Sequence, residues 1–297
     1  MNRFFTLFVF LFVFTQLSLA QELGYGIRVG LNFNKLNGPS ETDDDGNNLE
    51  SVDFNTGFHV GGVFLLKFTD LFGVRTGLFY SQRGMKYKYE GPSFQFFTED
   101  ISGDLVKSTG NRIYRLTVSN SYIEIPLTAY YKLGERFEVH GGILMGFLVG
   151  SRAVGEFDYK GAFPIGNDNI DFIQNLDFDY RKDNPASPDD IDDNTPVIVF
   201  PSRNDVVRIP ETVGAYYMDF PEKSGNFYNG FDLGVTGGFS FFLNSGLFIM
   251  LSGNYGLVDA TNDFYDISRY ESDGLEYIPR NDKDYNVSLQ VSVGFSF

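Results

Sequence analysis

The sequence predicts an all-β protein, a transmembrane antiparallel up-and-down β-barrel of eight strands. Its 297 residues include 33 Gly, 33 Phe and 18 Tyr, spread along the chain as in β-sandwiches and barrels. Segments of mostly 10 to 13 residues alternate between apolar and polar side chains, and a tilted strand needs ~9–11 residues to cross a bilayer. The gaps between these segments are short and long in turn, which is typical of periplasmic turns and extracellular loops.

Eight segments carry this alternation. In chain order they are Gly26–Leu36, Phe54–Phe68, Phe72–Lys88, Tyr122–Tyr131, Phe137–Val149, Phe231–Phe242, Leu247–Leu257 and Tyr285–Phe297. Alternation alone would also fit a soluble sandwich, so the regular change of gap length decides for the membrane barrel. A ten-stranded barrel, with pieces of the longest gap as extra strands, is the structural alternative.

The fourth segment shows the pattern most clearly. Ile123, Ile125 and Leu127 lie on one face, while Tyr122 and Glu124 lie on the other. Pro126 stands inside this segment although proline has no N–H for a strand ladder. We therefore expect a β-bulge or a local break at Pro126, which turns Glu124 into the lumen.

The polar faces of the segments predict what fills the barrel. Eight strands enclose a space that side chains fill, whereas open channels need roughly 16 to 18 strands. The charged residues and histidines expected to point into the barrel are Arg28, His59, Lys67, Arg75, Glu124, Glu138, His140 and Asp232. Because buried charges are normally paired, we expect a structural plug, with a gated proton or ion path as the alternative.

The two ends of the chain indicate export. Arg3, the apolar run Phe4–Phe14 and the small residues Ser18 and Ala20 predict a signal peptide at residues 1–20, cleaved to leave a barrel domain at 21–297. The chain has no Cys, which excludes disulfides, thiolate metal sites and a lipoprotein anchor.

Four stretches resemble the PorT-like outer-membrane β-barrel family of Bacteroidota-type bacteria. They are Gly26–Leu36, Leu78–Gly84, Tyr122–Pro126 and Asn254–Asp259. The resemblance implies a multi-pass barrel in the outer membrane of a Gram-negative cell, surrounded by outer-membrane lipid. It also implies that the outer-membrane assembly machinery reads the aromatic C-terminal strand at Val293, Phe295 and Phe297. The name-giving member is associated with a bacterial secretion system.

The gap after the fifth segment is long and acidic. Residues 156–226 contain 15 Asp or Glu and 6 Lys or Arg. The strand-like pieces Val197–Phe200 and Val206–Ile209 favour a folded extracellular cap over a flexible acidic loop. In the first long gap, Glu41, Asp43, Asp45 and Asn47 form a weak match to a Ca²⁺ loop, and a solvated loop is the default interpretation.

These features predict a structural or interaction scaffold that displays acidic loops to an extracellular or secretion-system partner. The formal net charge of −16 argues against nucleic acid as a partner. His59 and His140 are the two histidines, neither has a neighbouring nucleophile in the pattern, and no cofactor motif is present, so we expect no catalysis and no cofactor. A narrow or gated pore, or an accessory component of a secretion or uptake assembly, is the alternative. A hydrolase active at the barrel rim would have to use one of the two histidines.

Overall fold

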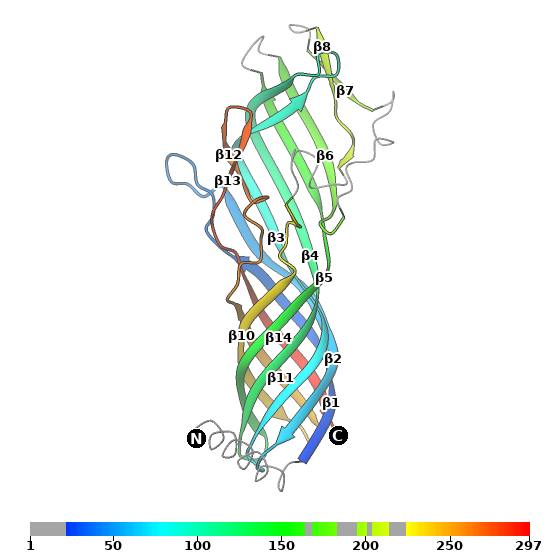
Figure 1. Cartoon of the computed structure of the whole chain (residues 1–297), viewed down its shortest axis with the longest axis vertical. Helices are drawn as coiled ribbons and strands as arrows, with labels where there is room; N and C mark the ends of the chain where they lie inside the picture. Colours follow the sequence, from blue (N-terminus) through cyan, green and yellow to red (C-terminus); the bar gives the residue numbers. More distant parts are fainter. Residues whose placement is uncertain (1–21, 164–167, 183–194, 201–203, 214–223) are drawn as a thin grey trace, which may run out of the picture.

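Eight strands close into a ring in the computed structural model, which describes residues 22–163, 168–182, 195–200, 204–213 and 224–297 (Figure 1). The predicted signal peptide lies outside the described residues. The strands of the ring are β1 (Glu22–Asn37), β2 (Glu50–Lys67), β3 (Phe72–Thr98), β4 (Leu105–Leu133), β5 (Phe137–Ala162), β10 (Phe231–Phe242), β11 (Leu247–Gly256) and β14 (Tyr285–Ser296). Neighbours pair antiparallel, and β5 pairs with β10 to close the ring. The eight-stranded prediction is confirmed, and the ten-stranded alternative is wrong.

The outside of the ring is apolar. Ile27, Val29 and Leu31 of β1 are each at least half exposed, and the other strands repeat this pattern. Aromatic pairs lie near both ends of the ring, such as Tyr25 with Phe297 at 5.3 Å and Phe147 with Phe231 at 5.4 Å. An apolar surface of this extent is stable only in contact with lipid, and aromatic girdles mark the two interfaces of barrels that span membranes.

One end of the ring carries short turns, the start of β1 and the C-terminus, and we call it the turn end. At the opposite end, the loop end, β3, β4 and β5 continue beyond the ring as an open sheet (Figure 1). The upper part of β5, residues 152–162, pairs with β6 (Asn169–Asp179), and β6 pairs in parallel with the two-residue β9 (Thr212–Val213). We call this continuation of β3 to β6 the loop-end sheet.

The loop-end sheet corrects the sequence analysis. We expected a long gap from about Lys88 to Leu116, but β3 runs to Thr98 and β4 begins at Leu105. Likewise, β5 continues to Ala162, past the expected end at Val149. These extensions lie above the lipid, so their outer faces carry Glu90 and Arg115 where membrane strands carry apolar residues. The apolar alternation that identifies a membrane strand is therefore absent from their outer faces.

Residues 156–226 do not form a single loop. Besides β6 and β9, the described part holds the hairpin of β7 (Val197–Phe200) and β8 (Asp205–Arg208), close to the two pieces predicted as strands. A second small hairpin, β12 (Ile267–Asp273) with β13 (Glu276–Pro279), lies beside β3.

Pro126 does not carry the expected bulge. Its register with Leu144 of β5 is regular. The ladder with β3 skips the pairs opposite Ile125 and Pro126 and resumes in the same register, so only the break is present. Thr76 Oγ1 donates to the Pro126 carbonyl at 2.8 Å. In the pair of β4 and β5, the bulge falls instead between Ser121 and Tyr122 of β4, where the strands leave the ring.

The lipid-facing assignment predicts the effect of a charge on the ring. Val291 lies in the middle of β14 with its side chain outward, so Val291→Arg should destabilise the barrel in lipid vesicles by about 2–4 kcal/mol. Val154 is also exposed, 54% against 40% for Val291, but it lies on the loop-end sheet, and Val154→Arg should change stability by less than about 0.5 kcal/mol. Urea titration of the reconstituted barrel measures both, and equal losses would contradict the assigned position of the membrane.

Candidate functional site at the loop end

Arg83 organises the charges inside the barrel. Its Nε donates to Glu124 Oε1 at 2.7 Å, and its Nη1 donates to Asp232 Oδ2. All three side chains are at most 5% exposed. The three residues come from β3, β4 and β10, so the guanidinium joins strands from different parts of the ring. The candidate cluster in the sequence omitted Arg83, although it shares its face of the third segment with Arg75.

Arg75 and Glu138 form the second buried pair. Arg75 Nη2 donates to Glu138 Oε1 at 2.6 Å, and the guanidinium carbon lies 5.1 Å from the centre of the Tyr130 ring. Lys67 does not join this cluster. It lies at the turn end, about one-third exposed, and pairs with Glu22 at 3.0 Å.

Arg28 is buried without a carboxylate partner among the described residues. Its guanidinium carbon lies 4.2 Å from the centre of the Phe79 ring, and Nη1 donates to Met250 Sδ at 2.9 Å. A cavity of about 20 Å³ separates Arg28 from Arg75 and His140, which is room for about one water molecule.

The two histidines contact hydroxyl and amide groups. His59 Nδ1 lies 2.6 Å from Asn32 Oδ1, and its Nε2 lies 2.8 Å from Ser292 Oγ. His140 Nε2 lies 3.1 Å from Ser252 Oγ. The sequence pattern had placed no nucleophile beside either histidine, and this was wrong. Both serines are buried inside the barrel.

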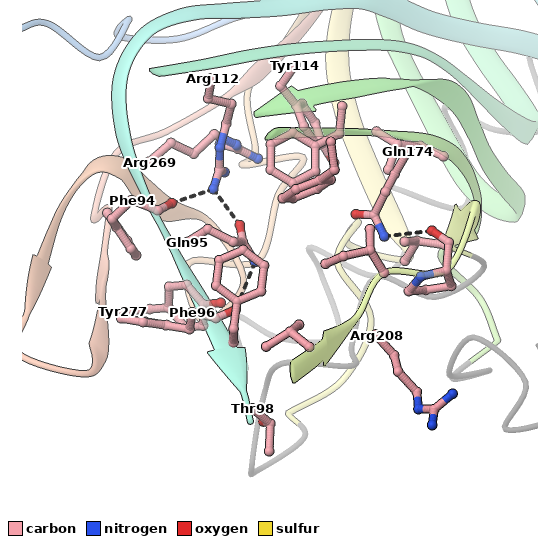
Figure 2. Close-up of a pocket in the computed structure, with 18 of the residues that line it drawn as sticks. Phe94, Gln95, Phe96, Thr98, Arg112, Tyr114, Gln174, Arg208, Arg269 and Tyr277 are labelled. Atoms are coloured by element: carbon pink, nitrogen blue, oxygen red, sulfur yellow. Dashed lines mark hydrogen bonds between the residues drawn. The ribbon is translucent and has the colours of Figure 1, made fainter. Parts of the chain in front are cut away.

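A cavity of about 590 Å³ opens on the loop-end sheet (Figure 2). We call it the loop-end pocket. Its residues come from β3 to β6, from the β8 region and from the β12–β13 hairpin. Ligand pockets in proteins range over ~300–1,000 Å³ and are mostly apolar with a few polar groups, so this cavity has the size and the lining of a small-molecule site.

Two aromatic groups form the walls of the loop-end pocket. On one side, the Phe96 ring lies 5.0 Å from Phe94 and 4.9 Å from Tyr277. On the other side, the Phe157 ring lies 5.4 Å from Phe172 and 5.8 Å from Tyr114. Offset and edge-to-face packing at these distances holds the rings in fixed orientations.

Two arginines bring positive charge to these walls. Arg112 Nη2 donates to the Phe94 carbonyl at 2.6 Å and to Gln95 Oε1 at 2.7 Å (Figure 2). The Arg269 guanidinium lies over the rings of Tyr87 and Tyr114, at 5.1 and 5.3 Å from their centres. The sequence does not predict the pocket, because its residues come from separate strands and hairpins.

Glu50 and Glu41 hold the β12–β13 hairpin in place. The Glu50 carboxylate accepts two bonds from Arg280 Nη1, at 3.0 and 2.9 Å, and one from the Tyr87 hydroxyl at 2.5 Å. Burial of Glu50 opposes its ionisation, but Arg269 and Arg280 outweigh this effect and lower the pKa of Glu50. Glu41 accepts the backbone N–H groups of Arg269 and Tyr270.

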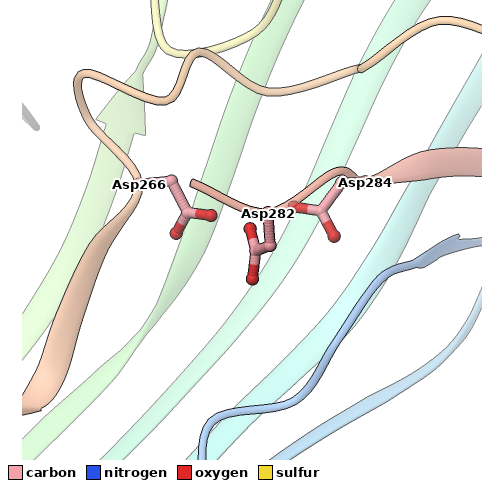
Figure 3. Close-up of side chains that lie close together, drawn as sticks. All are labelled: Asp266, Asp282 and Asp284. Atoms are coloured by element: carbon pink, nitrogen blue, oxygen red, sulfur yellow. The ribbon is translucent and has the colours of Figure 1, made fainter. Parts of the chain in front are cut away.

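Glu41 and Asp43, two residues of the weak Ca²⁺ match, already bond to protein groups. Glu41 points to the β12–β13 hairpin, while both oxygens of Asp43 accept bonds from Asn47, at 2.8 and 2.9 Å. In the described residues, the carboxylates close enough to share one ion are instead Asp266, Asp282 and Asp284 (Figure 3).

The three aspartates already have compensating charge. Arg280 Nη2 donates to Asp282 at 2.7 Å. Burial and a hydrogen bond with Asp282 raise the pKa of Asp266 to about 8, and burial and the charge of Asp282 raise the pKa of Asp284 to about 6. At neutral pH, therefore, a proton on Asp266 and the Arg280 guanidinium both offset the negative charge of the cluster.

Residues 14–262 match the model of a protein family described as the outer membrane protein beta-barrel domain. The chain belongs to this family. The barrel therefore lies in the outer membrane, where the apolar band of the ring meets lipid. None of the curated proteins compared with this sequence matches it. In the described part of the chain, no helix has the length and hydropathy needed to cross a membrane.

Solved structures of outer-membrane proteins are similar to the chain at low identity. Ail, the attachment invasion locus protein of Yersinia pestis, is 10% identical to this chain, with a TM-score of 0.37. The match covers 93% of this chain and 99% of the Ail chain. OprG of Pseudomonas aeruginosa has 12% identity, 92% and 95% coverage and a TM-score of 0.32. The protease OmpT of Escherichia coli has 10% identity, 93% and 96% coverage and a TM-score of 0.24.

The Arg83 network predicts a large loss of stability when its cation is removed. Arg83→Met leaves Glu124 and Asp232 buried and unpaired, so it should destabilise the barrel by about 3–5 kcal/mol. The triple variant that also carries Glu124→Gln and Asp232→Asn should recover much of this loss, because no unpaired charge remains. Urea titration in vesicles measures the difference, and a triple variant no better than the single one would contradict the role of charge.

The Asp266 cluster predicts a pH dependence for the β12–β13 hairpin. When the hairpin is packed against the barrel (docked), the pKa of Asp266 is about 8 and that of Asp284 is about 6. When the hairpin is released (undocked), both carboxyls return to a pKa near 3.8, so the docked state binds more protons between these values. Docking should therefore weaken as pH rises from about 4 to about 8 and should level off above. Asp266→Asn should flatten this profile, whereas Asp273→Asn, at the exposed hairpin tip, should not. Hydrogen exchange of residues 267–279 across this range measures the profile, and the same slope in both variants would contradict the assignment.

Proposed function

We propose that this protein is a non-catalytic scaffold of the outer membrane, with a filled barrel that displays the loop-end sheet and its acidic loops to an extracellular partner. The observation that carries the proposal is the continuity of β3, β4 and β5 from the lipid-facing ring into the loop-end sheet. A sheet built from membrane strands is held at a fixed height and orientation above the membrane. The barrel then serves as a rigid support for the display surface.

The filled interior of the ring favours a scaffold function over a transport function. Arg75 pairs with Glu138 and Arg83 pairs with two carboxylates, so the lumen is crossed by side chains held by charge-assisted bonds. Eight-stranded barrels leave room for little besides their own side chains. The proposal includes export with removal of residues 1–20, and assembly in which Val293, Phe295 and Phe297 are read as the C-terminal signal.

A narrow or gated pore, or an accessory part of a secretion or uptake assembly, is the second candidate. It is favoured by buried polar atoms that have no hydrogen-bond partner beside the 20 Å³ cavity, among them Arg75 Nε and His140 Nδ1. Such atoms offer sites for a transient water or proton. The resemblance to the PorT-like family supports the secretion form of this candidate.

Two measurements separate the candidates. In planar bilayers the scaffold should give no steady current, because its lumen is plugged, and a reproducible conductance would favour the pore. The scaffold should also retain a partner from native outer membranes after mild solubilisation, and a variant lacking residues 163–226 should lose it. The matched control removes the β12–β13 hairpin instead. Identical sets of bound proteins for the full chain and the 163–226 deletion would contradict display by this region.

A further inference from the structure

The loop-end pocket contains a guanidinium with incomplete hydrogen bonding. Arg112 lies half-buried on β4, and its Nη2 contacts are to the neutral oxygens of Phe94 and Gln95. Its Nε is buried and has no hydrogen-bond partner among the described residues. No carboxylate of the described residues forms an ion pair with it. The guanidinium carbon of Arg112 lies 4.7 Å from the centre of the Phe157 ring.

The described residues around Arg112 also leave its positive charge without a counter-charge. Arg269, a second arginine that lines the pocket, has Glu50 at 3.9 Å and two tyrosine rings, while Arg112 has no comparable counter-charge among the described residues. Burial and the charge of Arg269 lower the pKa of Arg112. A partly buried cation without a counter-ion is costly, and an anion bound beside it would offset that cost.

The remaining walls define what else a ligand must carry. Phe96, Phe172 and Tyr277 line the cavity and are only partly buried. Gln174 lies opposite Arg112 and is held by its bond to the Pro210 carbonyl at 2.9 Å (Figure 2). A cavity of about 590 Å³ with these walls has room for one flat or branched apolar body.

We propose that the loop-end pocket binds a small amphipathic carboxylate, with its apolar body between the two aromatic walls and its carboxylate on Arg112. Arginine binds a planar carboxylate through parallel N–H donors, which matches the unused donor capacity of this side chain. The inference goes beyond the display function and does not depend on a protein partner. The same chemistry is found in aromatic acids and in free fatty acids, so the experiment includes both.

The probe is 2-naphthoate, followed by its fluorescence anisotropy with the full mature chain in lipid nanodiscs. The chain has no Trp, so no indole emission overlaps with that of the naphthyl ring. Arg112→Met should weaken binding by about 10- to 100-fold, because a charge-assisted bond is lost. Arg115→Met is the matched control: Arg115 lies three residues along β4, half exposed and paired with Glu156 at 3.3 Å, and its loss should leave binding unchanged.

Two further experiments test the contacts of the ligand's apolar body and the class of carboxylic acid that binds. The neutral analogue 2-naphthalenemethanol should bind weakly and equally to the wild type and to Arg112→Met, while Phe172→Ala should weaken both probes. Displacement of naphthoate by benzoate but not by octanoate would assign the site to aromatic acids, and the reverse order would assign it to fatty acids.

The proposal would be overturned by either of two results. One is no saturable naphthoate binding beyond that of empty nanodiscs. The other is equal naphthoate affinity in the wild type and Arg112→Met, both folded as judged by the migration of unheated samples on gels. If Arg112→Met does not fold, the comparison passes to Phe172→Ala, and unchanged naphthoate affinity in that variant overturns the proposal in the same way.

Discussion

The pairing of β5 with β10 is the constraint on which the rest of the structure depends. A sheet in lipid must close, because an open edge would leave N–H and C=O groups without partners in a medium that supplies none. Closure after eight strands makes the interior narrow. Charges that face this interior must then find partners from across the ring, as Arg83 does with Glu124 and Asp232.

Closure also explains why β5 can serve two sheets. Its lower half pairs with β10 and completes the ring, and its upper half pairs with β6 where lipid no longer demands closure. The bulge between Ser121 and Tyr122 lies close to this change of neighbour. Above the ring, the sheet opens, and one of its faces is free to form the wall of a pocket.

The hairpins at the loop end complete that pocket. Glu50 at the start of β2 holds Arg280, and Glu41 holds the backbone of β12, so segments more than 200 residues apart in the chain are joined. These contacts place Arg269 and Tyr277 against the loop-end sheet. The proposed ligand site therefore depends on the same ionic contacts that dock the hairpin.

The sequence by itself determined the parts that repeat. A period of two along each strand, enforced by lipid outside and packed side chains inside, predicted the eight strands, their faces and most of the inward charges, from Arg28 to Asp232. It did not predict the loop-end sheet, because strands in water carry polar outer faces, with residues such as Glu90 and Arg115. Nor could it pair Arg83 with its carboxylates or bring Arg112 to the Phe157 ring of β5. Only the tertiary structure decided these contacts, since they join strands whose register and closure no local pattern encodes.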